Sequence, residues 1–263
     1  MSKKVFHIGL LLLSVTVIFY FNSCKTAEDK RLEISLNGTW EIAKTDTLSG
    51  IPARFTAKVP VPGLVDMADP AIDEQDTSYE NSIYWYKKKF TIDVVGTKIA
   101  RLKINKAKYH TRVYINGEFV GEDFHNFTPS LFNIKPYLLN QGRENELILA
   151  VGCKNNLPDT VVHGGDWEKI KYIPGIYDDV RIILSGYPCI SNIQTVPDLE
   201  NSQLRVVAEI ETAENRQELD LAYSISEVAS GKIVARGSVR KQESSNGLAI
   251  ADLKVTIPEF KPW

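Results

Sequence analysis

The sequence is poor in the residues that stabilise small proteins without a large core. It has three cysteines among 263 residues, with no Cys-x-x-Cys pair and no Cys/His cluster. A structural zinc site needs such ligands at close spacing, and a disulfide framework needs several cysteine pairs, so the sequence predicts neither. Because 43% of the residues are hydrophobic, the chain can bury a sizeable core, and the fold must depend on apolar burial.

An excess of basic residues is also missing. Lysine and arginine number 31 against 33 aspartates and glutamates, which gives a formal net charge of -2. The broad positive potential that attracts proteins to nucleic acids is therefore absent. We expect no nucleic-acid partner.

The common catalytic and cofactor motifs are missing as well. The sequence has no Gly-x-Ser-x-Gly elbow, phosphate loop, Gly-x-Gly-x-x-Gly or His-Glu-x-x-His. His110, His125 and His163 are well separated along the chain, and each is best interpreted as solvated or hydrogen-bonded, with a cluster in space as the alternative. We therefore nominate no catalytic residue, no metal site and no cofactor.

The N-terminus has the order of regions found in a secretory signal. Lys3 and Lys4 precede an apolar run over residues 5–21, and Ser23-Cys24 follows. The run of 17 residues is shorter than the roughly 20 that a membrane span needs. This pattern predicts export.

The segment Phe21-Asn22-Ser23-Cys24 resembles a bacterial lipobox, in which cleavage before the cysteine leaves it as the acylated N-terminus. The resemblance implies a signal peptide over residues 1–23, a lipid on Cys24, a polar tether over residues 24–32 and an outer-membrane lipoprotein on the periplasmic or cell-surface face. Two alternatives remain: an uncleaved anchor, or ordinary secretion with Cys24 left as a thiol.

Each of these alternatives places the chain in an oxidising compartment. Cys153 and Cys189 would remain in the mature protein, where they either pair or stay as free thiols. The sequence alone does not place them within bonding distance.

Beyond the tether the pattern is one of short strands. Runs of about 5 to 8 residues rich in Val, Ile, Thr, Tyr and Phe are separated by Gly, Pro, Asn and Asp clusters, with almost no helical periodicity. The clearest element is a hairpin, in which residues 111–115 and 118–121 flank Asn116-Gly117, a loop suited to the positive φ angles of a type I′ turn. Residues 146–151 and 179–184 have the mixed pattern of strands inside a two-sheet sandwich.

After residue 186 the alternation becomes regular. Residues 204–211, 219–225 and 251–257 alternate apolar and polar side chains, which gives each strand one buried and one solvent-facing side. We place a domain boundary near Tyr187-Pro188, where this change occurs.

The fold class is therefore all-β in two domains. Residues 33–186 suffice for an eight-stranded jelly-roll sandwich, whereas residues 187–263 are fewer than the roughly 100 of a seven-stranded immunoglobulin-like β-sandwich. The second sandwich is expected to lack its closing strands, to expose apolar residues such as Leu253 and Val255, and to be the more protease-sensitive part.

Six segments occur in an order that has a counterpart in a known family: Leu36–Trp40, Val59–Gly63, Tyr84–Phe90, Val113–Gly121, Phe127–Ile134 and Pro174–Val180. Together they resemble the sugar-binding, galactose-binding-like jelly roll at the N-terminus of family 2 glycoside hydrolases, the β-galactosidase, β-glucuronidase and β-mannosidase group. Residues 188–263 resemble the immunoglobulin-like domain of that family.

In that family a (β/α)₈ barrel follows and carries both catalytic glutamates. Retaining glycosidases need two carboxylates about 5 to 5.5 Å apart, and no alternation of strands and helices supplies a barrel here. The chain stops at Trp263, inside a family segment. The resemblance thus implies an O-glycosyl hydrolase whose barrel is missing from this chain or comes from a partner chain, with no catalytic carboxylate pair in these residues.

The resemblance also implies substrate contacts from the jelly roll. In the galactosidase branch an Asn four residues before the aromatic-Tyr strand and an Asp before the Gly-Ile-aromatic strand reach the active site, and Asn81 and Asp166 match these positions. Amide and carboxylate groups hold sugar hydroxyls by directional hydrogen bonds, and Trp167 could offer an aromatic face. The alternatives are a turn cap for Asn81, a solvated acid for Asp166 and a plug against the neighbouring domain for Trp167.

Tyr84-Trp85-Tyr86 suggests a stacking platform, but on a strand Trp85 points away from its two neighbours. We expect at least one of these two sides to be core, and Trp40 as well. Lys87-Lys88-Lys89 also alternate faces, which favours a solvated strand over an anionic site.

Two classes of function remain. The first is the N-terminal, non-catalytic portion of an exported family 2 β-glycosidase that acts on a β-linked oligosaccharide or glycan. The second is a free-standing surface lipoprotein module that binds glycans or a protein partner without catalysis. The first is favoured because the chain ends inside a family segment.

Overall fold

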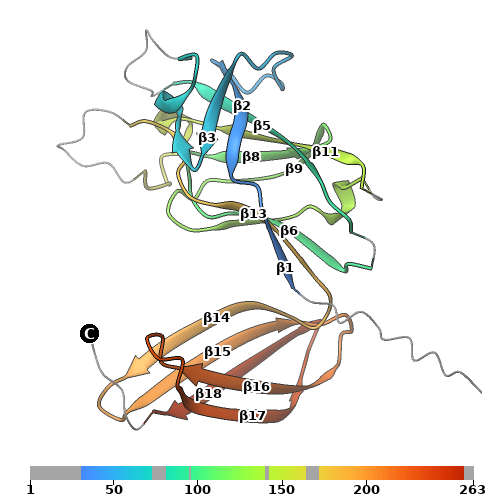
Figure 1. Ribbon diagram of the computed structural model, residues 1–263, viewed down its shortest axis with the longest axis vertical. Helices are drawn as coiled ribbons and strands as arrows, with labels where there is room; N and C mark the ends of the chain where they lie inside the picture. Colours follow the sequence, from blue (N-terminus) through green and yellow to red (C-terminus); the bar gives the residue numbers. More distant parts are fainter. Residues whose placement is uncertain (1–30, 73–80, 95, 140–141, 164–171, 258–263) are drawn as a thin grey trace, which may run out of the picture.

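The chain folds almost entirely into strands, as expected from its sequence. The computed structural model describes residues 31–72, 81–94, 96–139, 142–163 and 172–257, which form strands and a few single helical turns (Figure 1). Strands β1 to β13 and strands β14 to β18 share no sheet. None of the helical turns in these ranges is long and apolar enough to cross a bilayer.

The first group of strands forms a two-layer jelly-roll sandwich. In chain order its elements are β1 (Leu32–Ser35), β2 (Gly38–Thr45), β3 (Ala57–Val61), β4 (Gly63–Leu64), η1 (Val65–Met67), β5 (Ile83–Thr91), β6 (Ile99–Ile104), β7 (Ala107–Lys108), β8 (Thr111–Ile115), β9 (Glu118–Asp123), β10 (Ser130–Asn133), η2 (Lys135–Tyr137), β11 (Glu144–Val151), η3 (Lys154–Asn156), β12 (Gly175–Ile176) and β13 (Val180–Ser185). The sheets have the orders β3-β2-β5-β11-β8-β9, β1-β13-β6-β10 and β4-β12-β7. The two larger sheets form the layers.

The inner faces of these sheets bury one continuous apolar core. Alternation along β5 sends Tyr84 and Tyr86 into it, and Trp40 joins them from β2. The Trp40 indole Nε1 donates a hydrogen bond to the carbonyl of Leu36 at 2.8 Å, so its polar atom is satisfied inside the core. This confirms that Trp40 is a core residue.

The middle of the opposite face of the six-stranded sheet is also buried. Trp85 points to that side and packs with Ile148 under the loop after β2, which contributes Ile51 and Phe55. Its indole Nε1 donates a hydrogen bond to Thr45 Oγ1 at 2.8 Å. The three aromatic residues of β5 therefore form no platform, as predicted, and both of their sides are core.

The charged end of β5 is solvated, as the alternation of its lysines predicted. Lys87 and Lys89 each pair with a glutamate of a neighbouring strand, and Lys88 Nζ donates a hydrogen bond to a backbone carbonyl at 3.1 Å. The predicted turn between β8 and β9 is confirmed by its backbone, with φ of 52° at Asn116 and 84° at Gly117.

The second group of strands forms a smaller, immunoglobulin-like sandwich. Its elements are β14 (Cys189–Asp198), β15 (Gln203–Glu211), β16 (Glu218–Ser226), β17 (Ile233–Glu243) and β18 (Leu248–Thr256). A sheet of order β14-β15-β18 faces the pair β16-β17 (Figure 1).

The expectation that Leu253 and Val255 are exposed is wrong. Val255 is only 4% exposed and Leu253 packs against the small core, because β16 and β17 already cover β15 and β18. The uncovered strand is β14. Its Ile193 lies across from Ala208, and therefore on the inner face, yet it is 57% exposed.

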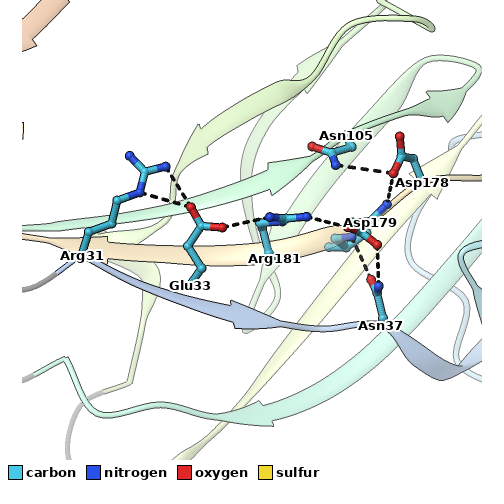
Figure 2. A network of polar contacts seen from close by, with 8 residues as sticks. Arg31, Glu33, Asn37, Asn105, Asp178, Asp179 and Arg181 are labelled. Carbon is cyan, nitrogen blue, oxygen red and sulfur yellow. Dashed lines mark hydrogen bonds and ion pairs between the residues drawn. The ribbon is translucent and has the colours of Figure 1, made fainter. Parts of the chain in front are cut away.

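A row of polar contacts ties β1 to β13 (Figure 2). Glu33 accepts hydrogen bonds from Arg31 at 3.0 Å and from Arg181 at 2.9 Å. Arg181 also pairs with Asp179, whose other oxygen accepts a hydrogen bond from Asn37 Nδ2 at 2.7 Å. Such exposed contacts contribute little stability each, but they fix the register of an edge strand.

Polar contacts between described residues join the sandwiches. Arg31 Nη1 donates to the carbonyl of Ile190 at 3.4 Å, and Arg101 of β6 forms an ion pair of 2.5 Å with Glu211 of β15. Both cysteines of the described part, Cys153 and Cys189, are buried and form no disulfide. The choice left open by the sequence is therefore resolved in favour of thiols.

Candidate functional site

The ends of four strands meet at one end of the six-stranded sheet. Val151, at the end of β11, lies opposite both Tyr84 of β5 and Thr111 of β8. Thr111 lies in turn opposite Asp123, at the end of β9. Because neighbouring antiparallel strands run in opposite directions, the loops before β5, before β8, after β9 and after β11 gather at this end.

Two of these loops line a cavity of about 610 Å³, formed by residues 122–128 and 160–162. Its lining is mainly apolar, and the Phe127 ring is 54% exposed. Val162, on the other loop, is also exposed. An apolar cavity with a few placed polar groups is the usual form of a small-molecule site.

The buried side of this cavity is built on a charged cluster. His110 Nε2 lies 2.9 Å from Glu122 Oε2, and Arg112 Nε donates a hydrogen bond to the same oxygen at 2.7 Å. The imidazole of His110 stacks on Phe124 with ring centroids 4.2 Å apart. The hydrogen bond from His110, helped by Arg112, holds the pKa of Glu122 below its usual range.

A second carboxylate lies next to it. Burial alone would raise the pKa of Asp123, but hydrogen bonds from the His125 backbone N–H, the Ser130 side chain and the His125 ring outweigh burial and leave the pKa lowered. His125 Nδ1 is 2.6 Å from Asp123 Oδ1. Both carboxyl groups are thus ionised at neutral pH, which suits binding and not the work of a general acid, because a general acid needs a raised pKa.

Asn126 joins the two loops. Its side chain is 2% exposed, and its Nδ2 donates a hydrogen bond to the carbonyl of Val162 at 3.1 Å. The hydroxyl of Tyr177 donates to the Asn126 carbonyl at 2.6 Å. The amide oxygen Oδ1 of Asn126 is buried and has no hydrogen-bond partner among the described residues.

Asn81 lies at the same end, just before β5. Its side chain is exposed, and its Oδ1 accepts a hydrogen bond from Asn155 Nδ2 at 2.9 Å. The loop after β11 therefore holds the amide of Asn81 in place. Nothing in this geometry tests a contact with a ligand, so its role stays a prediction.

The family assignment follows from the sequence of this sandwich. Residues 28–188, more than half of the chain, match the family model described as "Glycosyl hydrolases family 2, sugar binding domain". The chain belongs to glycoside hydrolase family 2. The matched segment contains all three sheets of the first sandwich and every loop of the end described above.

Known relatives of this family 2 chain agree with the assignment. It is 24% identical over 183 residues to the β-galactosidase large subunit of Leuconostoc lactis, and 28% identical over 150 residues to a β-galactosidase of Thermoanaerobacter pseudethanolicus. These alignments cover 67% and 49% of this chain but only 28% and 19% of the relatives. The family 2 chain therefore spans less than a third of either protein.

Solved structures share the fold over most of the chain. A β-D-mannosidase from Dictyoglomus thermophilum matches 86% of it with a TM-score of 0.65 and 20% identity, over 31% of the mannosidase. A β-glucuronidase from Bacteroides uniformis also matches 86% of it, with a TM-score of 0.67 and 19% identity, over 28% of the glucuronidase. The similarity extends beyond residue 188 and so includes the immunoglobulin-like part of the family 2 fold.

Several predicted positions lie outside the described residues. Asp166 and Trp167 belong to the segment 164–171, and Cys24 precedes residue 31. His163 is described, and its ring lies edge-on to Tyr172 with centroids 5.9 Å apart. In the described part, no group of three or more His, Cys, Asp or Glu side chains is placed to hold a metal ion.

The sequence interpretation missed the charged cluster and the cavity. His110 and Glu122 are twelve positions apart, and they meet because the Asn116-Gly117 turn folds β9 back along β8. Pairing the residues on either side of that turn, one by one along the two strands, would have placed His110 and Glu122 near each other. No comparable signal links residues 122–128 to residues 160–162, which belong to different strand ends.

Proposed function

We propose that this chain is the sugar-binding, non-catalytic N-terminal part of an exported family 2 β-glycosidase that acts on a β-linked oligosaccharide or glycan. The family match over residues 28–188 supports the class of ligand, and the position of Asn81 among the clustered loops supports a contact with the substrate. The β-galactosidase relatives favour a β-galactoside as the first substrate to try.

Hydrolysis in this proposal is performed by a barrel in a further segment of the polypeptide or in a partner chain. The two carboxylates of the cavity, Glu122 and Asp123, are each paired with basic groups and have lowered pKa values. A retaining mechanism needs one carboxylic acid that can donate a proton at the working pH. The chain alone should therefore release no nitrophenol from nitrophenyl β-galactoside, β-mannoside or β-glucuronide.

The decisive experiment joins a catalytic barrel to this chain. The nucleotide sequence beyond codon 263, or a neighbouring reading frame, is searched for a barrel with two glutamates, and that barrel is produced joined to this chain. We expect hydrolysis from the joined protein, with a KM raised at least fivefold by Asn81→Ala. Turnover by the chain alone that disappears on substitution of one of its own carboxylates would overturn the proposal.

Export and anchoring form a separate part of the proposal. We propose that residues 1–23 are removed, that Cys24 carries the lipid, and that the protein is held in the outer membrane on its periplasmic or cell-surface face. In cells fed radiolabelled palmitate, the wild-type protein should be labelled and Cys24→Ser should not be. A soluble, unlabelled wild-type protein in the periplasm would contradict the anchor and leave the glycosidase proposal standing.

A free-standing binding module is the competing outcome. It would be supported if the wild-type chain is lipidated, no barrel is encoded nearby, and a glycan or protein still binds to the chain. The joined-barrel experiment separates the two, because a binding module gains no hydrolysis from a family 2 barrel.

A further inference from the structure

The cavity formed by residues 122–128 and 160–162 has the chemistry of a sugar-ring site. It combines an exposed aromatic ring, Phe127, with an ionised carboxylate, Asp123, and a buried amide, Asn126. We infer that this cavity binds one pyranose ring of a β-linked glycan, with the ring face on Phe127 and its hydroxyls on Asp123 and Asn126. The inference rests on the proposed function for the class of ligand only.

The aromatic ring provides the apolar half of the contact. A pyranose has a face of C–H groups that packs on an aromatic ring, and its burial contributes in proportion to the apolar area removed from water. Phe127 lies in the loop after β9, and half of its surface is open to solvent. The volume of about 610 Å³ is within the range of sites that enclose a ligand of one or two rings.

The polar half of the contact consists of groups that accept hydrogen bonds. Asn126 Oδ1 is buried and unpartnered among the described residues, a state that costs free energy until a donor reaches it. A sugar hydroxyl is such a donor. Asp123 lines the same cavity and accepts hydrogen bonds from His125 and from the Ser130 side chain. A carboxylate offers about four acceptor sites, so it can take a further donor.

The same groups argue against an anionic ligand. Asp123 and Glu122 bring two negative charges to one side of the cavity, and Arg112 is already paired with Glu122. A neutral ring with several hydroxyls satisfies the acceptors without adding charge. We therefore expect galactosides and mannosides to bind more tightly than glucuronides.

The test is a binding titration of the full mature chain, labelled with ¹⁵N, using methyl β-galactoside, β-1,4-mannobiose and methyl β-glucuronide as probes. We expect a Kd on the order of 1 mM for the neutral probes, about -4 kcal/mol, with the largest shifts at the side-chain amide of Asn126. Phe127→Ala should raise the Kd at least fivefold, and Phe127→Trp should not weaken binding.

Phe119 provides the matched control. It is 50% exposed and lies on β9 beside the Asn116-Gly117 turn, at the other end of the same strand. Phe119→Ala should leave the Kd within twofold of wild type. Melting curves of both alanine variants show whether the sandwich stays folded, and Phe127→Trp keeps the test valid if Phe127→Ala unfolds.

Two results would overturn the inference. If Asn81→Ala abolishes binding and Phe127→Ala does not change it, the sugar binds at Asn81 alone, which supports the proposed function and refutes the cavity. If no probe at 50 mM shifts the amide of Asn126, the cavity is not a sugar site, and the proposed function is then judged by the joined-barrel assay.

Discussion

Substitution of Gly175 tests how closely β12 packs on β4 in the short sheet. Gly175 starts β12, the middle strand of the short sheet β4-β12-β7. A Cβ atom added at Gly175 would lie 2.5 Å from the carbonyl oxygen of Gly63 and 2.7 Å from the Cα of Leu64. Both atoms belong to the backbone of β4, so neither can rotate away. Gly175→Ala must therefore push β4 and β12 apart.

The expected loss of stability in Gly175→Ala is large. Overpacking costs about 1–3 kcal/mol, and we expect about 3 kcal/mol here because the clash involves two backbone atoms. In a domain of this size 1 kcal/mol corresponds to about 2–4 °C, so the melting temperature should fall by about 6–12 °C. The displacement should also reach Tyr177, two residues later, which holds the loop of Asn126 through its hydroxyl.

The measurement is scanning calorimetry of residues 24–263 with a matched alanine control. Gly50→Ala adds the same methyl group where nothing lies within 4 Å, and its stability should stay within about 0.5 kcal/mol of wild type. If Gly175→Ala melts within about 2 °C of the control, β4 and β12 are further apart than described, and the reasoning from close approach fails.

Three further substitutions test other contacts. Trp40→Phe removes the indole N–H and leaves the carbonyl of Leu36 without its donor, so urea unfolding should show a loss of about 1–3 kcal/mol. The folded pKa of Glu122 lies below its usual range, so the stability contributed by its ionised carboxylate is present at neutral pH and is lost as the pH falls through the folded pKa. The difference in stability between wild type and Glu122→Gln should therefore shrink between pH 7 and pH 3. Arg101→Gln breaks the ion pair with Glu211 between the sandwiches, and we expect a loss of about 0.5–1 kcal/mol and earlier tryptic cleavage near residue 187. Equal cleavage rates for the variant and the wild type would show that this ion pair does not join the two parts.

The elements fixed by local patterns were predictable from the sequence. Asn116-Gly117 requires two positive φ angles, and few other conformations suit that pair, so the hairpin followed directly. Trp40 and at least one side of the aromatic residues of β5 were expected in the core because large rings bury much apolar area.

The burial of the other strand faces depends on which element covers each face. The apolar and polar pattern of a strand does not say which element that is. The sequence did not show which of the two aromatic sides of β5 is buried, and both are, because the loop with Ile51 and Phe55 covers Trp85. Val255 was expected to be exposed because missing strands were assumed to uncover β18, whereas β14 is the uncovered strand. The cavity of the candidate site escaped prediction for the same reason: its two loops come together through the sheet and not through nearness in the chain.

The double burial of the six-stranded sheet has an evolutionary consequence. Every side chain from Ile83 to Tyr86 and from Leu147 to Val151 is buried, so a larger or polar side chain on either face of these two segments would disturb the packing. In a sandwich with one wet face, half of these positions could vary freely over generations. We expect substitutions to be tolerated better at the rim of the sheet, where Asn81 and Phe127 are exposed, than in these two buried segments.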